Sequence, residues 1–131
     1  MKNKGMALLL ALFTLTITSL LVVAFLELTT TDLQITSNHF NKNQALYIAD
    51  AGVEYAISQL KNNRSWSGTP GPIEFPAGSG NTYSVTYTST SGKIVSVARL
   101  SSGPQVILET KVNVRGNTFP YDVKIISWRE L

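Results

Sequence analysis

The sequence contains no cysteine, and long parts of it lack charge, glycine and proline. Without cysteine the chain forms no disulfides, iron–sulfur clusters or thiolate zinc sites. Charged residues make up 15% of the 131 residues, whereas ordinary domains carry about 25%. The deficit is local, because no charged residue falls between Lys4 and Glu27. Removing that stretch leaves roughly 105 residues, enough for a modest core but not for a large enzyme cleft.

The charge balance argues against several classes of function. Lysine and arginine total 11 and aspartate and glutamate total 8, for a net charge of +3. Two of the positive charges are Lys2 and Lys4, so the rest of the chain is close to neutral. Nucleic-acid-binding domains usually carry a basic patch or stripe, and we expect no nucleic-acid partner. The single histidine, His39, lies far along the chain from any second ligand group. We therefore expect no metal, no cofactor and no enzymatic activity.

Residues 6–26 form the most informative segment, a run of 21 residues without charge, proline or glycine. As a helix this run is about 31 Å long, which matches a bilayer core of about 30 Å. Lys2 and Lys4 precede the run, and the positive-inside rule then places the N-terminus in the cytoplasm and the C-terminus outside. A signal peptide cleaved near Phe25 and a plain single-pass anchor for an extracytoplasmic binding domain both remain open.

The segment that follows predicts a continuation of the same helix. Residues 29–44 are polar but contain neither glycine nor proline, and residues 44–60 carry an apolar stripe at spacings of three and four. The stripe consists of Leu46, Ala49, Val53, Ile57 and Leu60. Beside it runs a seam of small residues, where another backbone can approach closely: Ala45, Ala49, Gly52 and Ala56. The pattern predicts one helix over about residues 6–60.

The rest of the chain predicts a small sheet. Residues 62–81 hold four glycines and three prolines and indicate a loop. Strand patterns then recur at residues 82–88, 93–100, 105–115 and 121–128, separated by short turns that favour antiparallel neighbours. A four-stranded meander has one apolar face that must be covered, and the helical stripe is the available cover. The predicted fold is α+β, and we expect Trp128 to fill part of the core.

Two motifs resemble those of type IV pilin-like proteins, more narrowly the PilX class of minor pilins and the K-type pseudopilins of type II secretion. The first is Lys4-Gly5-Met6-Ala7-Leu8-Leu9-Leu10-Ala11-Leu12, which is similar to their leader junction. The second is Asn43-Gln44-Ala45-Leu46-Tyr47-Ile48-Ala49-Asp50-Ala51-Gly52-Val53-Glu54, which is similar to the alanine-rich end of their long helix. The resemblance covers roughly residues 4–60 and implies a pilin-like fold, with one long N-terminal helix packed on the four-stranded antiparallel sheet.

The resemblance also implies a function and a division of the chain. Residues 1–5 would be a prepilin leader, which a prepilin peptidase removes between Gly5 and Met6 before Met6 is N-methylated. Residues 6–26 would form the transmembrane and filament-core half of the helix, residues 27–61 its amphipathic half, residues 62–81 the loop and residues 82–131 the sheet. In the filament core we expect packing by Met6, Leu8, Leu10, Leu12 and Phe13. The implied partners are other pilin or pseudopilin subunits and the inner-membrane assembly machinery.

One departure from the family pattern bears on the role. Most pilins carry a glutamate at the fifth mature position, and this chain has Leu10 there. The K-type pseudopilins share this absence and resemble tip subunits, so the resemblance implies a minor pilin or pseudopilin that initiates or caps a filament. Asp50 and Glu54 lie four residues apart on one helical face and are candidates for a subunit contact or a weak cation site, although a merely solvated face is the simpler explanation.

Overall fold

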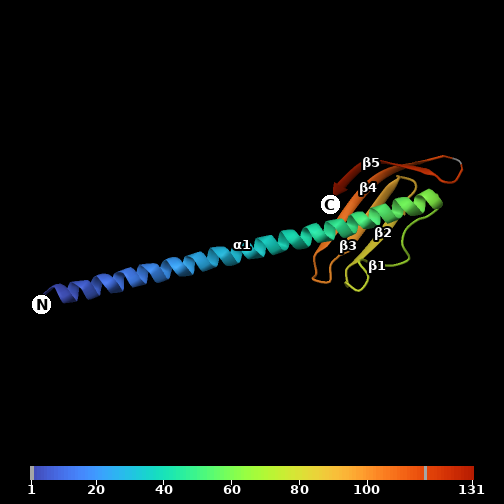
Figure 1. Cartoon of the computed structure of the whole chain (residues 1–131). Helices are drawn as coiled ribbons and strands as arrows, with labels where there is room; N and C mark the ends of the chain where they lie inside the picture. Colours follow the sequence, from blue (N-terminus) through green and yellow to red (C-terminus); the bar gives the residue numbers. More distant parts are fainter. Residues whose placement is uncertain (1, 117) are drawn as a thin grey trace. The chain divides into compact units, whose positions relative to one another are not determined.

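The computed structural model describes the backbone of residues 2–116 and 118–131, and the side chains of these residues from Gly5 onward. Met1 and the side chains of Lys2 and Lys4, which belong to the expected leader, lie outside the described residues. The chain divides into two compact units, Met1–His39 and Phe40–Leu131. One helix, α1 (Lys2–Asn62), contributes to both units (Figure 1).

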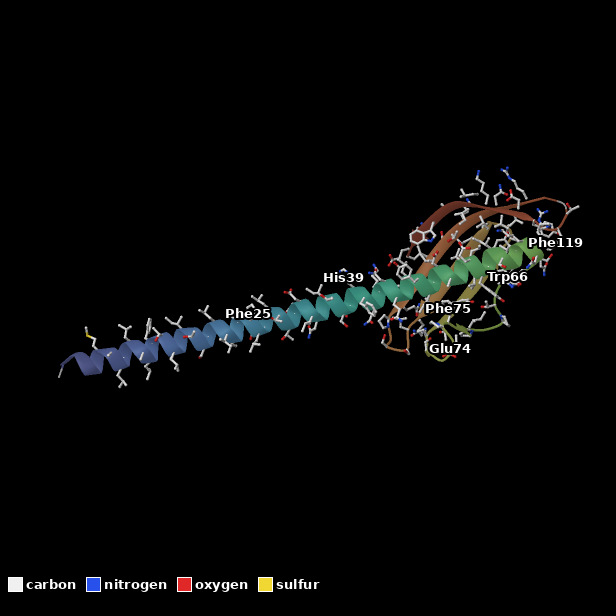
Figure 2. All side chains as sticks on the ribbon, viewed as in Figure 1. Phe25, His39, Trp66, Glu74, Phe75 and Phe119 are labelled. Atoms are coloured by element: carbon white, nitrogen blue, oxygen red, sulfur yellow. The ribbon has the colours of Figure 1, made fainter. Side chains whose placement is uncertain are left out.

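The first unit is helix alone. Every side chain described between residues 5 and 39 is exposed, and Phe25 and His39 extend freely from the ribbon (Figure 2). The three β-branched threonines at residues 29–31 do not interrupt α1. Their hydroxyls instead donate hydrogen bonds of 2.8–3.0 Å to the carbonyls four residues earlier, which satisfies the hydroxyls without leaving the helix.

The second unit contains an antiparallel meander of five strands in chain order. They are β1 (Ile73–Glu74), β2 (Thr82–Thr88), β3 (Lys93–Arg99), β4 (Gln105–Arg115) and β5 (Asp122–Glu130). The prediction of a helix packed on an antiparallel sheet is confirmed, with one correction. β1 lies in the segment expected to be loop, where Ile73 pairs with Tyr83 and the Phe75 amide donates to the Asn81 carbonyl at 2.9 Å. Two residues are too few to give an alternating pattern, so β1 has no strand signal of its own.

The core of this unit lies between residues 45–60 of α1 and one face of β2, β3 and β4. The helix crosses that face in Figure 1. Alternate residues of the three strands are buried, as expected for a sheet with one covered face. The buried apolar residues of these strands are Tyr83, Val85, Tyr87, Ile94, Ala98, Val106, Leu108 and Val112, and Ser96 and Thr110 are buried beside them.

The last strand differs from its neighbours, and the prediction that Trp128 is a core residue is wrong. Trp128 is 49% exposed, and no residue of β5 is buried. The reason is geometric. Five strands spaced about 4.8 Å apart span about 19 Å, whereas one helix with its side chains is about 10–12 Å wide. A single helix therefore cannot cover both edges of this sheet.

Candidate functional site

The first candidate surface is the N-terminal part of α1, which presents apolar side chains on all sides. The expected filament-core residues are all exposed here: Met6, Leu8, Leu10, Leu12 and Phe13. The segment is long and apolar enough to cross a membrane, with a mean hydropathy of 2.5 in its most apolar window. A helix that is apolar all round has no water-facing side, so it requires an apolar environment supplied by lipid or by other helices.

The three threonine hydroxyls in this segment are compatible with such an environment. The Thr14 hydroxyl donates to the Leu10 and Ala11 carbonyls at 3.0 and 2.9 Å, and the Thr16 hydroxyl donates to the Phe13 carbonyl at 2.8 Å. Thr18 makes the same kind of bond to the Thr14 carbonyl. In lipid every polar group must find its partner within the protein. These hydroxyls meet that condition inside the helix itself.

Gly5, at the expected cleavage position, stands in open space. A side-chain carbon added there would meet no heavy atom within 4 Å outside the local helix. Cleavage between Gly5 and Met6 would therefore disturb no tertiary contact of the described residues. The peptide between Gly5 and Met6 lies within α1, and its cleavage stays a prediction.

The second candidate surface is the contact between helix and sheet. Four of the five stripe residues, Ala49, Val53, Ile57 and Leu60, are buried, while Leu46 is half-buried and packs at the margin of the core. The complete buried face follows a spacing of three and four residues: Ala45, Ile48, Ala49, Gly52, Val53, Ala56, Ile57 and Leu60. Ile48 was missed by the sequence analysis, although its position three residues after Ala45 and four before Gly52 contains the signal.

Gly52 marks the closest approach between helix and sheet. A side-chain carbon at Gly52 would clash with the Ser96 hydroxyl oxygen on β3 and would lie 3.0 Å from the Tyr83 ring. The small-residue seam thus has the role that its composition predicts, which is to let α1 settle directly on the strands. The Ser96 hydroxyl is buried there without a hydrogen-bond partner among the described atoms.

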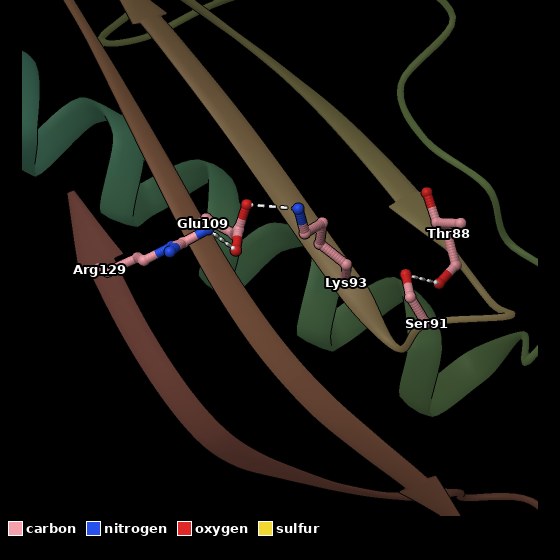
Figure 3. Close-up of polar contacts among 5 residues, drawn as sticks. All are labelled: Thr88, Ser91, Lys93, Glu109 and Arg129. Carbon is pink, nitrogen blue, oxygen red and sulfur yellow. Dashed lines mark hydrogen bonds and ion pairs between the residues drawn. The ribbon is translucent and has the colours of Figure 1, made fainter. Parts of the chain in front are cut away.

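The polar network of the second unit lies on the opposite face of the sheet. Glu109 on β4 accepts contacts from Lys93 Nζ at 2.5 Å and from Arg129 Nη2 at 2.7 Å, which joins β3, β4 and β5 (Figure 3). The hydrogen bond from Lys93 is the main cause that lowers the pKa of Glu109 below its usual value. The positive charges of Arg129 and Lys93 act in the same direction, while partial burial opposes them.

One comparison with known proteins decides the class of the N-terminal segment. Residues 4–54, fewer than half of the chain, match the family model described as PilX N-terminal. This segment belongs to the PilX class of type IV pilin-like proteins. The match covers both motifs that carry the resemblance and ends at Glu54 within α1. Searches of the curated proteins and of the solved structures gave no match.

Asp50 and Glu54, the expected subunit contacts of this pilin-like helix, are both exposed. The ion pairs found among the described residues join Lys42 to Glu130 and Glu109 to Lys93 and Arg129. Asp50 and Glu54 take part in none of these, and among residues 2–116 and 118–131 no group of three potential metal ligands comes together. The two carboxylates are thus accessible to a partner, and a subunit contact stays a prediction.

The sequence analysis also missed a functional candidate on β5. Ile125, Ile126 and Trp128 are exposed on β5, of which the sequence analysis expected Trp128 to be a core residue. The sequence gives no separate signal for this exposure, because adjacent apolar residues also occur in β3 and β4.

Proposed function

We propose that this chain is a structural minor pilin or pseudopilin that initiates or caps the assembly of a type IV pilus-like filament. The observation that carries the proposal is the match of residues 4–54 to the PilX N-terminal family. A type IV pilus-related protein of this kind works by assembling with other pilus subunits. It needs no catalytic centre, and we propose no enzymatic role.

The exposed helix supports a place in the membrane and then in a filament. Residues 6–26 have no apolar partner within their own unit. Lipid supplies that partner before assembly, with the C-terminus outside the cytoplasmic membrane, and the helices of neighbouring subunits supply it afterwards. Removing the leader lysines would lower the free-energy cost of moving the helix from lipid into the filament core, because buried charges are expensive in a helix bundle.

The residue at the fifth position after Gly5 supports a role at the filament tip. That residue is Leu10, which has no charge to neutralise the N-terminal amine of a subunit ahead of it. A subunit that begins a filament has no such neighbour and loses nothing by the substitution. Leu10→Glu therefore tests the assignment. At a tip position the glutamate would stay unpaired and hinder assembly, whereas in the shaft it would pair with an amine and favour incorporation.

The deciding experiment is the mass of the mature N-terminus, measured on protein made in its own cells. We expect a chain that begins at N-methylated Met6, and we expect the Gly5→Val variant to remain uncut because its branched side chain adjoins the scissile bond. An intact N-terminus retained in the membrane would replace the proposal with a single-pass anchored binding domain. A start near Phe25 would replace it with a secreted domain.

A further inference from the structure

The two edges of the sheet are covered to different extents by the rest of the chain. At the β1 edge the aromatic rings of Tyr55, Trp66, Tyr83 and Phe75 form a chain of contacts with centroids 6.1–6.3 Å apart. The loop after α1 also bonds to β2 there, since the Thr69 amide donates to the Val85 carbonyl at 2.9 Å. At the β5 edge no described residue provides an equivalent cover.

The side of β5 that faces the helix carries apolar residues. Glu130 reaches Lys42 on α1 at 2.9 Å, which places Glu130 on the helix side of the strand. Trp128, two residues earlier, shares that side. Ile125 lies opposite Val112, whose side chain belongs to the core beneath α1. Ile125 and Trp128 nevertheless remain 45% and 49% exposed. They form an apolar strip that adjoins the core at β4 and is left uncovered on β5.

The opposite side of β5 is basic. Lys124 and Arg129 lie there, beside Lys111 and Arg115 of β4. The acids on the same side are Glu109, already held by Lys93 and Arg129, and Asp122, which lies opposite Arg115. On this side bases outnumber acids, so the sheet presents apolar groups on one side of its free edge and a net positive charge on the other.

The backbone of β5 is also available for pairing. The strand has nine residues and pairs with β4 alone among the described strands. In an antiparallel ladder only alternate residues turn their amide and carbonyl groups toward a given neighbour, so the remaining groups of β5 point to the open edge. A shift in register at Lys111/Val112 leaves Ile126 without a partner and 59% exposed at the middle of this edge.

We propose that the free edge of β5 binds an extended strand of a partner protein in which apolar and acidic residues alternate. Backbone hydrogen bonds would add this strand to the sheet. Its apolar residues would extend the strip formed by Ile125 and Trp128, and its acidic residues would lie beside Lys124 and Arg129. A second copy of β5 is a poorer complement, because it brings two bases and one acid to the basic side.

This surface adds a partner-binding site to the proposed pilin function. It depends on that function only for the expectation that the partner is another extracytoplasmic subunit. Strand addition is measured on the folded second unit and leader cleavage on the N-terminus. The failure of one therefore leaves the other standing, and both can be read from the same purified full-length chain.

The first test uses three peptides with the full-length protein in detergent. The binding peptide is a capped nine-residue strand that alternates valine and glutamate. One control replaces glutamate by lysine, and the other keeps every side chain but N-methylates every backbone amide. We expect the glutamate peptide to bind and to slow hydrogen exchange in β5. The N-methylated peptide should not bind, because strand addition needs its amides. Absence of binding by the glutamate peptide, or equal binding by all three, would overturn the proposal.

The second test uses matched protein variants. Trp128→Ser should weaken binding of the glutamate peptide by about tenfold or more, as loss of a central aromatic anchor does, while Tyr47→Ser, on the exposed face of α1, should not change it. Lys124→Glu should weaken the glutamate peptide by about threefold and strengthen the lysine peptide. If Trp128→Ser and Tyr47→Ser behave alike, the binding site is not β5. If sedimentation shows a dimer that the peptide cannot dissociate, β5 pairs with a second copy instead.

Discussion

Helix α1 contains two regions that obey different rules. In residues 5–39 every described side chain is exposed, and the apolar ones occupy all sides of the helix. In residues 40–62 most apolar residues gather on one face and are buried there, while Phe40 and Tyr47 stay exposed. Both regions are helical, so the difference in burial comes from how the apolar residues are distributed around the helix axis.

The comparison shows how one helix can pack against the sheet of its own chain with one region and against lipid or other helices with the other. The second region carries its partner in the same chain, because the sheet covers a single stripe. The first region has apolar residues at every angle, and a single covering layer would leave half of them in water. Only surroundings on all sides, such as lipid or a bundle of helices, satisfy that pattern. The first three predictions below test this division, and the fourth tests the far side of the sheet as a contrast.

The largest effect is expected from a matched pair of leucine truncations. Leu60→Ala removes a fully buried side chain and should lower the free energy of unfolding of the second unit by about 2–5 kcal/mol. Leu15→Ala, the same change at an exposed position, should leave that transition unchanged. Urea unfolding followed by near-ultraviolet circular dichroism reports on this unit, because both tryptophans belong to it. Equal destabilisation by both changes would contradict the division.

The converse effect is expected from a charge in the first region. Leu15→Asp places a carboxylate near the centre of the apolar run, at a cost of about 2.5–3.5 kcal/mol for insertion in a bilayer. We expect the variant to leave the membrane fraction while its second unit unfolds at the wild-type urea concentration. Tyr47→Asp, an exposed change in the second unit, is the control and should stay in the membrane. Full retention of Leu15→Asp would show that residues 6–26 do not span the bilayer.

The fold could be predicted from the sequence wherever a pattern extends over several turns or several alternations. The helix, the strands β2 to β5 and the contact face around Val53 and Leu60 all follow from such patterns and are present in the structure. β1 could not be predicted, because its two residues pair only through the chance that the loop returns beside Tyr83. Short elements take their structure from their neighbours.

The candidate site was predictable in part for a similar physical reason. The exposed apolar helix and the PilX-class motifs are local in sequence, and the structure and the family match agree with them. The exposure of Trp128 is not local. It follows from the width of one helix compared with five strands, and the number of strands becomes known only when the sheet is assembled.

A smaller effect is expected at the closest contact of the second region. Gly52→Ala should cost about 1–3 kcal/mol of stability, because its added carbon runs into the Ser96 hydroxyl. Ser96→Ala alone should be nearly neutral, since that buried hydroxyl lacks a partner. The double variant should then recover much of the lost stability. The unfolding free energies of the wild type, the two single variants and the double variant give the coupling energy between positions 52 and 96. Additive effects would show that the helix does not rest on Ser96.

The smallest effect is expected from the charge network on the far side of the same sheet, which neither region of the helix touches. Because Lys93 and Arg129 lower the pKa of Glu109, its carboxylate stabilises the fold at pH values above the usual value of 4.5. That contribution should fade as the pH drops through the lowered pKa, where the folded state at last binds the proton. Melting temperatures measured from pH 7 to pH 3 should therefore fall less steeply for Glu109→Gln than for the wild type. Glu54→Gln removes an exposed carboxylate outside the network and should follow the wild-type curve. A Glu109→Gln profile parallel to the wild type would mean that Lys93 and Arg129 contribute no stability through this carboxylate.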